Sequence, residues 1–468
     1  MNIYFILIGL SVFRFALALL FPLTADESYY WLWSKHLALS YVDHPPMVAY
    51  INYLMTQGTN SIFLLRLGTV IITFLISIII YKFSEEIFNK KVAFWSAILF
   101  QILPHFLVIW LTMFVELPLG LFWALSIWIL IKIIKSRDKR LWYLLAITVG
   151  LGYLSKYTMF LFWPCLAIYF FLSKEDRFWL KKKEPYLAFI ISCLFFLPVL
   201  LWNNQYNWAS FTFHSAKAST DSFGINFLPF VGDQLVHFTP FLIFTLFPVW
   251  IYSLRGKGQG VIGSKILVAF SSPLILLFLI LSLKLKVWAH WPAIGYIAAL
   301  PLTINFLIEN KKSLRNFIVW ISLFSFLALS ILLFLTPGIL FRQNDYAQNY
   351  KIGDKLPKEF TLFAKTNVSS SLLEFYSGRT VYMDTKLFKT GPMWGEKQYE
   401  IWEIHELIPG ETIIYYGEFN AGQLQKAKEL FLNVSEVTNA KLYLIEDYIQ
   451  NNYRFYKLQG YKFSLGTP

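Results

Sequence analysis

The sequence predicts a polytopic α-helical membrane protein that ends in a small soluble α/β domain. Of its 468 residues, 57% are hydrophobic and only 15% are charged, and the mean hydropathy is +0.52. A soluble domain does not need this much apolar surface. The apolar residues form runs that approach the roughly 20 residues a helix needs to cross a bilayer. After Pro337 the polarity returns to that of an ordinary soluble protein.

The apolar runs predict about eleven membrane spans, with thirteen as the upper limit. They cover residues 3–23, 62–81, 92–110, 115–134, 141–154, 157–173, 186–202, 233–254, 264–283, 287–308 and 316–337. The first run carries Arg14 and is not followed by a small-residue cleavage site. We therefore interpret it as a retained helix rather than a cleaved signal peptide.

The loops between these spans differ in charge, and this difference predicts the orientation. With the N-terminus in the cytoplasm, one set of loops holds the Lys and Arg clusters at residues 82–91, 132–140, 174–183, 255–265 and 311–315. The opposite set holds only Lys35, Lys156, Lys217, Lys284 and Lys286. The positive-inside rule then predicts a multi-pass protein of the inner (plasma) membrane, with residues 24–61 forming the first extracytoplasmic (periplasmic) loop. The net charge of +13 is thus a topology signal and not a nucleic-acid footprint.

The last part of the chain predicts a separate domain. We expect a membrane domain over residues 1–340 and an extracytoplasmic α/β domain over residues 341–468. Residues 361–385 have the pattern strand, helix, strand. Further strands are expected at 412–416 and 441–445, with a helix at 421–431. Both cysteines, Cys165 and Cys193, lie inside apolar runs, so no disulfide framework or cysteine metal cluster is expected.

The first loop concentrates polar and aromatic residues between two apolar runs. Asp26 and Glu27 stand at its start, an aromatic stretch follows, and Asp43-His44-Pro45-Pro46 forms a second polar group. Titratable groups gathered at a membrane surface indicate a functional site. Two structural interpretations compete with that one: an amphipathic interfacial helix with an aromatic belt, and a buried Asp–His pair that holds the loop. We favour function because acids at a helix start are kept ionised by the helix dipole.

Five stretches together resemble one enzyme group. They are DESYYWLWSKHLALSYVDHPPMVAY (26–50), ELPL (116–119), GLGYLSKYT (150–158), PVLLWNNQYNWASFTF (198–213) and KVWAHWPAIGY (286–296). In this order they are similar to motifs of the bacterial GT-C glycosyltransferases, the group of the aminoarabinose transferases and the dolichyl-phosphate-mannose–protein mannosyltransferases. That group usually has Asp before the Leu/Ala-Pro-Leu motif, where this chain has the longer Glu116.

The resemblance implies an integral membrane glycosyltransferase. It would transfer a hexosyl- or pentosyl-type sugar, with inversion, from a polyprenyl-phosphate carrier to a cell-envelope acceptor: lipid A, another glycolipid, a polysaccharide or a protein. The implied partners are this donor, the acceptor and membrane lipids, with no nucleic acid. An outward-facing site has no supply of cytosolic nucleotide sugars, which also favours a lipid-linked donor.

Breaking the anomeric C–O bond passes through an oxocarbenium-like transition state, which needs a carboxylate to deprotonate the acceptor or to stabilise positive charge. By resemblance and position, Asp26 is the first catalytic candidate. Glu27 is the second, although it could equally be a charge at a helix N-terminus. Glu116 completes the catalytic set.

The leaving group is a lipid phosphate, so cations must gather near the acids. Lys156 is the strongest candidate, and its anionic partner is expected to be the phosphate, Asp26 or Glu116. The other expected substrate-binding residues are His44, Tyr157, Lys284, Lys286, His290 and Trp291. For the lysines, the alternative is a snorkelling rim of cations, and for tryptophans it is interfacial anchoring.

The cofactor and function alternatives remain open at this point. A divalent ion bridging Asp26, Glu116 and His44 is conceivable, although the spacing matches no recognised metal motif. A transporter or flippase for lipid-linked sugars would require inverted repeats and broken helices at the membrane midplane, which the sequence does not show. A non-catalytic envelope-assembly protein is the other alternative.

Overall fold

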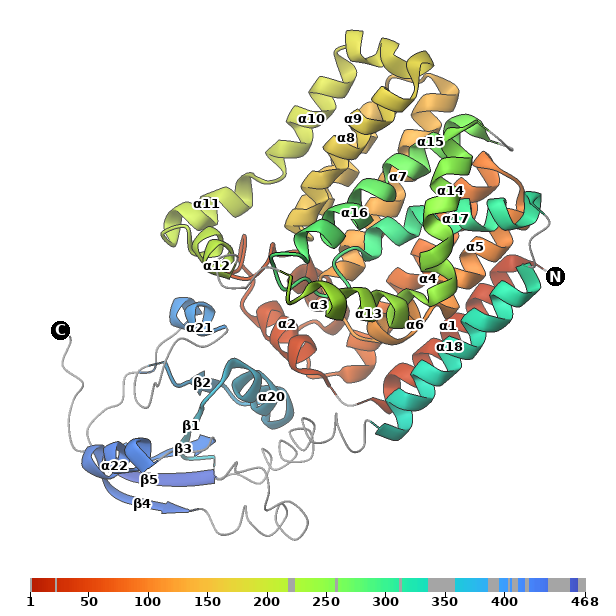
Figure 1. Cartoon of the computed structure of the whole chain (residues 1–468). Helices are drawn as coiled ribbons and strands as arrows, with labels where there is room; N and C mark the ends of the chain where they lie inside the picture. Colours follow the sequence, from red (N-terminus) through yellow and green to blue (C-terminus); the bar gives the residue numbers. More distant parts are fainter. Residues whose placement is uncertain are drawn as a thin grey trace.

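The computed structural model describes residues 2–21, 23–217, 224–256, 260–310, 314–335, 358–385, 395–402, 405, 411–416, 421–436 and 455–461. A bundle of long helices makes up most of the molecule, and a small sheet with its helices lies beside one end of the bundle (Figure 1). The α/β part is therefore placed next to the first loop and not among the spans.

The bundle contains the following helices. They are α1 (Ile3–Leu20), α4 (Ile62–Ile87), α5 (Lys90–Ile102), α6 (Pro104–Val108), η1 (Ile109–Leu111), α7 (Glu116–Ser136), α8 (Leu141–Tyr153), η2 (Tyr157–Leu161), α9 (Phe162–Leu172), η3 (Lys174–Lys181), α10 (Glu184–Leu194), α11 (Leu197–Gln205), α12 (Ala209–Lys217), α13 (Phe227–Phe238), α14 (Pro240–Leu254), α15 (Val261–Ala269), α16 (Ser272–Leu281), α17 (Ala293–Glu309) and α18 (Leu314–Leu335).

Each of the eleven expected spans coincides with helical structure, so the chain is a multi-pass membrane protein. Among the described residues, six helical segments are long and apolar enough to cross a membrane by themselves, or eight if each of two bent pairs is one span. Three shorter apolar helices, at 141–153, 157–172 and 293–309, account for the rest. The apolar runs in the sequence located the spans, but the breaks within the spans are seen only in the structure. Residues 336–337, the end of the last expected span, lie outside the described part.

Two spans are bent at prolines. The helix axis turns by 58° between α5 and α6, at Pro104, and by 98° between α13 and α14, at Pro240. A proline has no N–H to continue the helix and clashes with the preceding turn, so a helix breaks there and a new one begins. Thr239, at the second bend, has a φ of 68°, and its hydroxyl accepts from the Leu242 amide to start α14.

Arg14 is buried in α1 and lies against the first of these bends. Its Nε donates to Gln101 Oε1 at 3.0 Å and its Nη2 to the Gln101 carbonyl at 2.9 Å, and Nη1 donates to the Phe106 carbonyl. Gln101 in turn donates to Ser77 Oγ at 2.6 Å. The guanidinium thus binds carbonyl groups at a break in the helix, where they lack their usual partners.

The first loop is mostly helical. It contains α2 (Ala25–Lys35) and α3 (Met47–Thr56). Thr24 begins α2 with a capping box, in which its hydroxyl accepts from the Glu27 amide and the Glu27 side chain accepts from the Thr24 amide. The Met47 amide donates to the Leu154 carbonyl at 2.8 Å, which ties the start of α3 to the end of α8. The loop is therefore held against the bundle at both of its helices.

The α/β part holds a five-stranded sheet with the order β2-β1-β3-β5-β4. The elements are β1 (Thr361–Ala364), α20 (Asn367–Ser377), β2 (Val381–Met383), α21 (Glu396–Trp402), β3 (Ile413–Tyr416), α22 (Ala421–Leu430), β4 (Phe431–Glu436) and β5 (Phe455–Tyr461). β1 pairs in parallel with β2 and β3, and β5 pairs antiparallel with β3 and β4. The expected strand–helix–strand unit and the expected helix and strand near 412–431 are confirmed, while residues 441–445 lie outside the described part.

Candidate functional site

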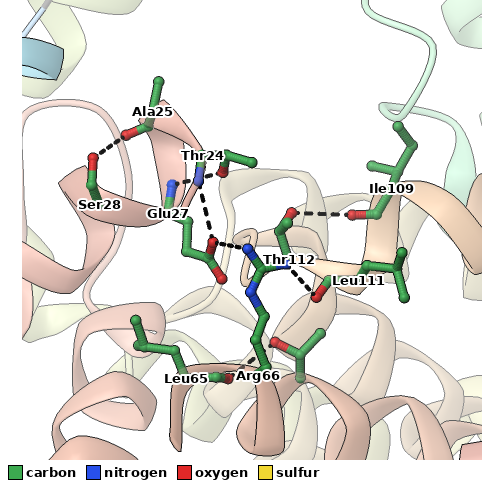
Figure 2. Close-up of polar contacts among 10 residues, drawn as sticks. Thr24, Ala25, Glu27, Ser28, Leu65, Arg66, Ile109, Leu111 and Thr112 are labelled. Carbon is green, nitrogen blue, oxygen red and sulfur yellow. Dashed lines mark hydrogen bonds and ion pairs between the residues drawn. The ribbon is translucent and has the colours of Figure 1, made fainter. Parts of the chain in front are cut away.

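Two buried acids of the predicted catalytic set lie in different surroundings, and Glu27 is the more enclosed. Figure 2 shows its carboxylate facing the Arg66 guanidinium of α4, with Oε2 and Nη2 separated by 2.7 Å and both side chains fully buried. Arg66 Nη1 also donates to the Leu111 carbonyl at 3.1 Å. Together with the capping box at Thr24, these contacts make Glu27 a connection between α2 and the bundle. The geometry favours the helix-terminus interpretation of Glu27.

Glu116 lies at the start of α7 and joins two of the predicted cations. Lys156 Nζ forms a salt bridge to Glu116 Oε1, and His290 Nε2 lies 3.2 Å from the same oxygen. The Lys156 Nζ also lies 6.0 Å from the centre of the Trp291 ring. His290 is 30% exposed, so this cluster reaches the surface. The structure therefore brings together four residues from three separate motifs of the sequence.

Tyr30 connects this cluster to Asp26. Burial raises the pKa of Tyr30 well above its usual value, and the carboxylates of Asp26, Glu116 and Asp43 raise it further. The three carboxylates are therefore close enough to the phenol to act on it electrostatically. Because the phenol keeps its proton, it is a hydrogen-bond donor near these carboxylates. Asp26 is half-buried at the start of α2, and it acts on the same phenol as Glu116.

The Asp43–His44 turn lies near the same residues. His44 is close enough to Glu116 to interact with it electrostatically, and its ring lies 6.3 Å from the Tyr30 ring. His214, on α12, contacts this turn, with Nε2 2.9 Å from the Asp43 carbonyl and its ring 6.2 Å from that of His44. The His214 ring also meets the Tyr157 ring edge-on at 5.4 Å. His44 and Tyr157 thus join the candidate site.

Lys284 and Lys286 lie on the loop that precedes His290. Both are exposed, and Lys286 Nζ lies 4.8 Å from the centre of the Trp288 ring, which is 46% exposed. This arrangement fits a rim of cations and aromatic rings at the membrane surface. Their predicted contact with substrate remains a prediction.

The alternative in which Asp26, Glu116 and His44 bind a metal stays a prediction. Within the described ranges, no group of three or more His, Cys, Asp or Glu side chains is arranged to hold an ion, and the Glu116 oxygen lies against Lys156 and His290.

Solved structures with the same architecture decide the fold. The chain is similar to ArnT from Cupriavidus metallidurans bound to undecaprenyl phosphate, with a TM-score of 0.67 over 97% of each chain at 12% sequence identity. The oligosaccharyltransferase of Archaeoglobus fulgidus matches 80% of this chain and 64% of its own, with a TM-score of 0.51 and 12% identity. The chain has the GT-C fold. The resemblance seen in the five sequence stretches is thereby confirmed at the level of fold.

Sequence comparison supports the same group for part of this GT-C chain. The sequence model of the dolichyl-phosphate-mannose-protein mannosyltransferase family matches residues 43–202, which contain His44, Glu116 and Lys156. The lipid A galacturonosyltransferase RgtD of Rhizobium johnstonii is 26% identical over 296 residues. That alignment spans 62% of this chain and 62% of the relative.

Some residues of the candidate site were not predicted from the sequence. Tyr30 is part of the aromatic run in the first loop. The spacing of these aromatic residues did not show whether Tyr30 is an anchor in the membrane interface or a residue of the site. His214 was not among the expected site residues, since nothing in the sequence around it pointed to the Asp43 turn. Arg66 lies inside an apolar run, and a single buried cation there was the one available signal of an acidic partner.

Proposed function

We propose that this protein transfers a sugar from a polyprenyl-phosphate carrier to an envelope glycolipid of the lipid A type. The observation that carries the proposal is the cluster of Glu116, Lys156 and His290, which faces Asp26 across Tyr30 within a GT-C fold. The proposal is supported by carboxylates and cations that lie together in a cluster in which the His290 side chain is 30% exposed. Glycosyl transfer from a lipid phosphate requires both kinds of group.

In this proposal Asp26 is the catalytic carboxylate. It lies in the first turn of α2, where the helix dipole favours its ionised form. It accepts the proton of the acceptor hydroxyl as the new glycosidic bond forms at the anomeric carbon. At the same time the bond from that carbon to the phosphate oxygen breaks, and the phosphate leaves with the electron pair. A single displacement of this kind inverts the anomeric configuration.

Lys156 and His290 receive the phosphate in this scheme. In the structure both lie against Glu116, which holds the Lys156 ammonium in place. An arriving phosphate competes with Glu116 for the same cations, because a dianion attracts them more strongly than one carboxylate does. His44 and Tyr157 line the space beside them and contact the donor or acceptor. Lys284 and Lys286 at the rim attract the anionic head groups.

The identities of donor and acceptor come from the relatives. ArnT from Cupriavidus metallidurans holds undecaprenyl phosphate in its crystal structure, and RgtD is named as a galacturonosyltransferase of lipid A. We extend to this chain the class of carrier, the class of acceptor and a hexosyl- or pentosyl-type sugar. We also propose the periplasmic orientation of the site and of residues 341–468, on the charge distribution of the loops.

The direct test is transfer by the purified protein in lipid nanodiscs. Polyprenyl-phosphate-linked sugars are supplied with lipid A, and the products are weighed by mass spectrometry. We expect a glycosylated lipid A from the wild type and none from Asp26→Asn. Robust transfer from a nucleotide sugar without a lipid carrier would refute the donor class.

The same protein reconstituted into sealed liposomes separates this proposal from its rivals. A flippase would move the lipid-linked sugar across the liposome membrane without forming a new glycosidic bond. A non-catalytic assembly protein would bind the lipid and leave both substrates chemically unchanged. Either result with the wild type would overturn the proposed transfer.

A further inference from the structure

The α/β part contacts the first loop at the side opposite the bundle (Figure 1). Helix α20 packs on α2 through Ser371, whose Oγ lies 2.8 Å from Ser28 Oγ. The Phe375 ring meets the Trp31 ring edge-on at 4.8 Å, and the Phe375 carbonyl accepts from Asn60 Nδ2 at 2.7 Å. Helix α2 is therefore enclosed between the bundle and α20.

Helix α21 makes a second and more local contact with the loop. Gln398 Oε1 accepts a hydrogen bond from the Val42 amide at 2.8 Å, and both residues are buried. The Tyr399 ring stacks on the Tyr29 ring, with centres 6.3 Å apart and planes 8° from parallel. Trp402 stacks on His36 at 4.9 Å. One short helix thus touches both α2 and the turn that follows it.

These contacts fall directly beside residues of the candidate site. Val42 precedes Asp43 and His44, so its amide sets the start of that turn. Tyr29 precedes Tyr30, and its hydroxyl donates to Asp43 Oδ2 at 3.0 Å. The stacked Tyr29 therefore connects α21, α2 and the Asp43 turn in one buried series of contacts. A shift of α21 would move both Tyr29 and the Asp43 turn.

We propose that α21 is a positioning element for sugar transfer, in which Gln398 and Tyr399 hold the first loop in the geometry that the reaction needs. The inference rests on the proposed function for its kinetic consequence, whereas its structural part stands on the contacts alone. A displacement of about 1 Å at a reacting group lowers the rate up to a hundredfold. The α/β part is in this view a component of the transfer site rather than an appended module.

The first experiment replaces Gln398 by a residue of similar shape that cannot accept from an amide. Gln398→Met keeps the volume and removes the hydrogen bond to Val42. The matched control is Gln425→Met on α22, where Gln425 is exposed and its Nε2 donates to Glu429 Oε1 within the same helix. The second variant, Tyr399→Leu, removes the ring stack on Tyr29. It tests the positioning role of α21 independently if Gln398→Met does not fold.

Two quantities are measured on the full-length protein in nanodiscs. Hydrogen exchange of the amides of residues 41–47 reports the loop, and kcat and the donor KM report transfer. We expect faster exchange in both variants, a kcat lowered about tenfold or more, an unchanged donor KM, and wild-type behaviour for Gln425→Met. Unchanged thermal midpoints would exclude a general loss of folding.

The outcomes separate this inference from the proposed function. Wild-type exchange at 41–47 in Gln398→Met and Tyr399→Leu would overturn the positioning role, whatever the kinetics. Faster exchange with an unchanged kcat would overturn it as well. If the wild type transfers no sugar, the proposed function has failed, and the exchange data still decide whether α21 holds the loop.

Discussion

Glu27 and Glu116 are both buried acids in the first turn of a helix, and both form ion pairs, yet their surroundings differ. Glu27 and Arg66 are fully enclosed, and the pair is completed by the capping box and by the Leu111 carbonyl. The Glu116 cluster is more open, since the side chains of Lys156 and His290 are 10% and 30% exposed. A fully enclosed pair holds structure, whereas a partly exposed pair can exchange its partner for a ligand.

Neighbouring acids in one motif can have opposite tasks. Asp26 and Glu27 are adjacent in the sequence, but Asp26 acts electrostatically on Tyr30 whereas Glu27 pairs with Arg66. Glu27 fixes α2 to the bundle, and Asp26 precedes it on the same helix.

Asp26→Asn should abolish most of the activity. The variant keeps the shape of the side chain and removes the base, so we expect transfer to fall by about 10²- to 10⁴-fold. The thermal midpoint should stay within the range of Asp138→Asn, a matched change in a loop on the predicted cytoplasmic side. Near-normal turnover by purified Asp26→Asn would show that the catalytic carboxylate lies elsewhere.

Glu27→Gln should act on stability instead. It leaves the buried Arg66 guanidinium without its counter-ion, and breaking a buried pair from one side costs about 3–5 kcal/mol. Chemical denaturation in detergent measures this loss, with the exposed Glu429→Gln as the control. Arg66→Met combined with Glu27→Gln should recover part of the stability. A fully stable Glu27→Gln that has lost transfer would reverse the roles given to the two acids.

Glu374 of α20 is a third buried acid, and its hydrogen-bond partner is a backbone amide. Burial raises the pKa of Glu374 to about 7, while the Val381 amide and the charge of Lys35 oppose the shift. The folded state thus prefers the protonated acid, and the associated stability is fully present below the ordinary pKa and is lost as the pH rises through about 7. At 1.36 kcal/mol per unit, the loss is about 3 kcal/mol. Unfolding curves from pH 5 to 8 should show it in the wild type, and a wild-type slope in Glu374→Gln would contradict it.

Lys156→Met should cost the least stability, because His290 still faces Glu116 and the cluster is partly open to water. We expect a loss of about 1–2 kcal/mol and about a tenfold weaker binding of polyprenyl phosphate. Lys156→Arg should restore part of the binding, since it keeps the charge but changes the reach. The control is the exposed Lys174→Met.

The double variant Lys156→Met with Glu116→Gln distinguishes the two roles of Lys156. If the lysine binds phosphate, the double variant still binds the lipid weakly. Unchanged lipid affinity in Lys156→Met, together with stability regained in the double variant, would mean that Lys156 only balances Glu116.

The sequence was sufficient for much of the fold and for part of the site. Apolar runs located the spans because a bilayer imposes their length, and the alternation of positive charge indicated their orientation. Glu116 was among the anions expected for Lys156, since an ammonium between apolar runs requires one. The strand–helix–strand unit at 361–385 also followed from its pattern.

The remaining contacts depend on tertiary structure that local patterns do not contain. Glu27 and Arg66 are distant in sequence, and Arg66 lay inside an expected span without any visible partner. The contacts of Gln398 with Val42 and of Tyr399 with Tyr29 join residues more than 350 positions apart. The bends at Pro104 and Pro240 divide apolar runs that look continuous, because hydropathy averages over a break.

The buried Arg14 has a consequence for biosynthesis. Its partner Gln101 follows 87 residues later, so α1 leaves the ribosome long before the carbonyl groups at the α5–α6 bend exist. An arginine at the centre of an inserting helix costs about 2.5–3.5 kcal/mol. We expect α1 to stay beside the insertion machinery until α5 arrives, and crosslinking of arrested chains of increasing length would follow its release. During assembly, α1 would then be stably inserted in the membrane only after α5 and the α5–α6 bend have been made.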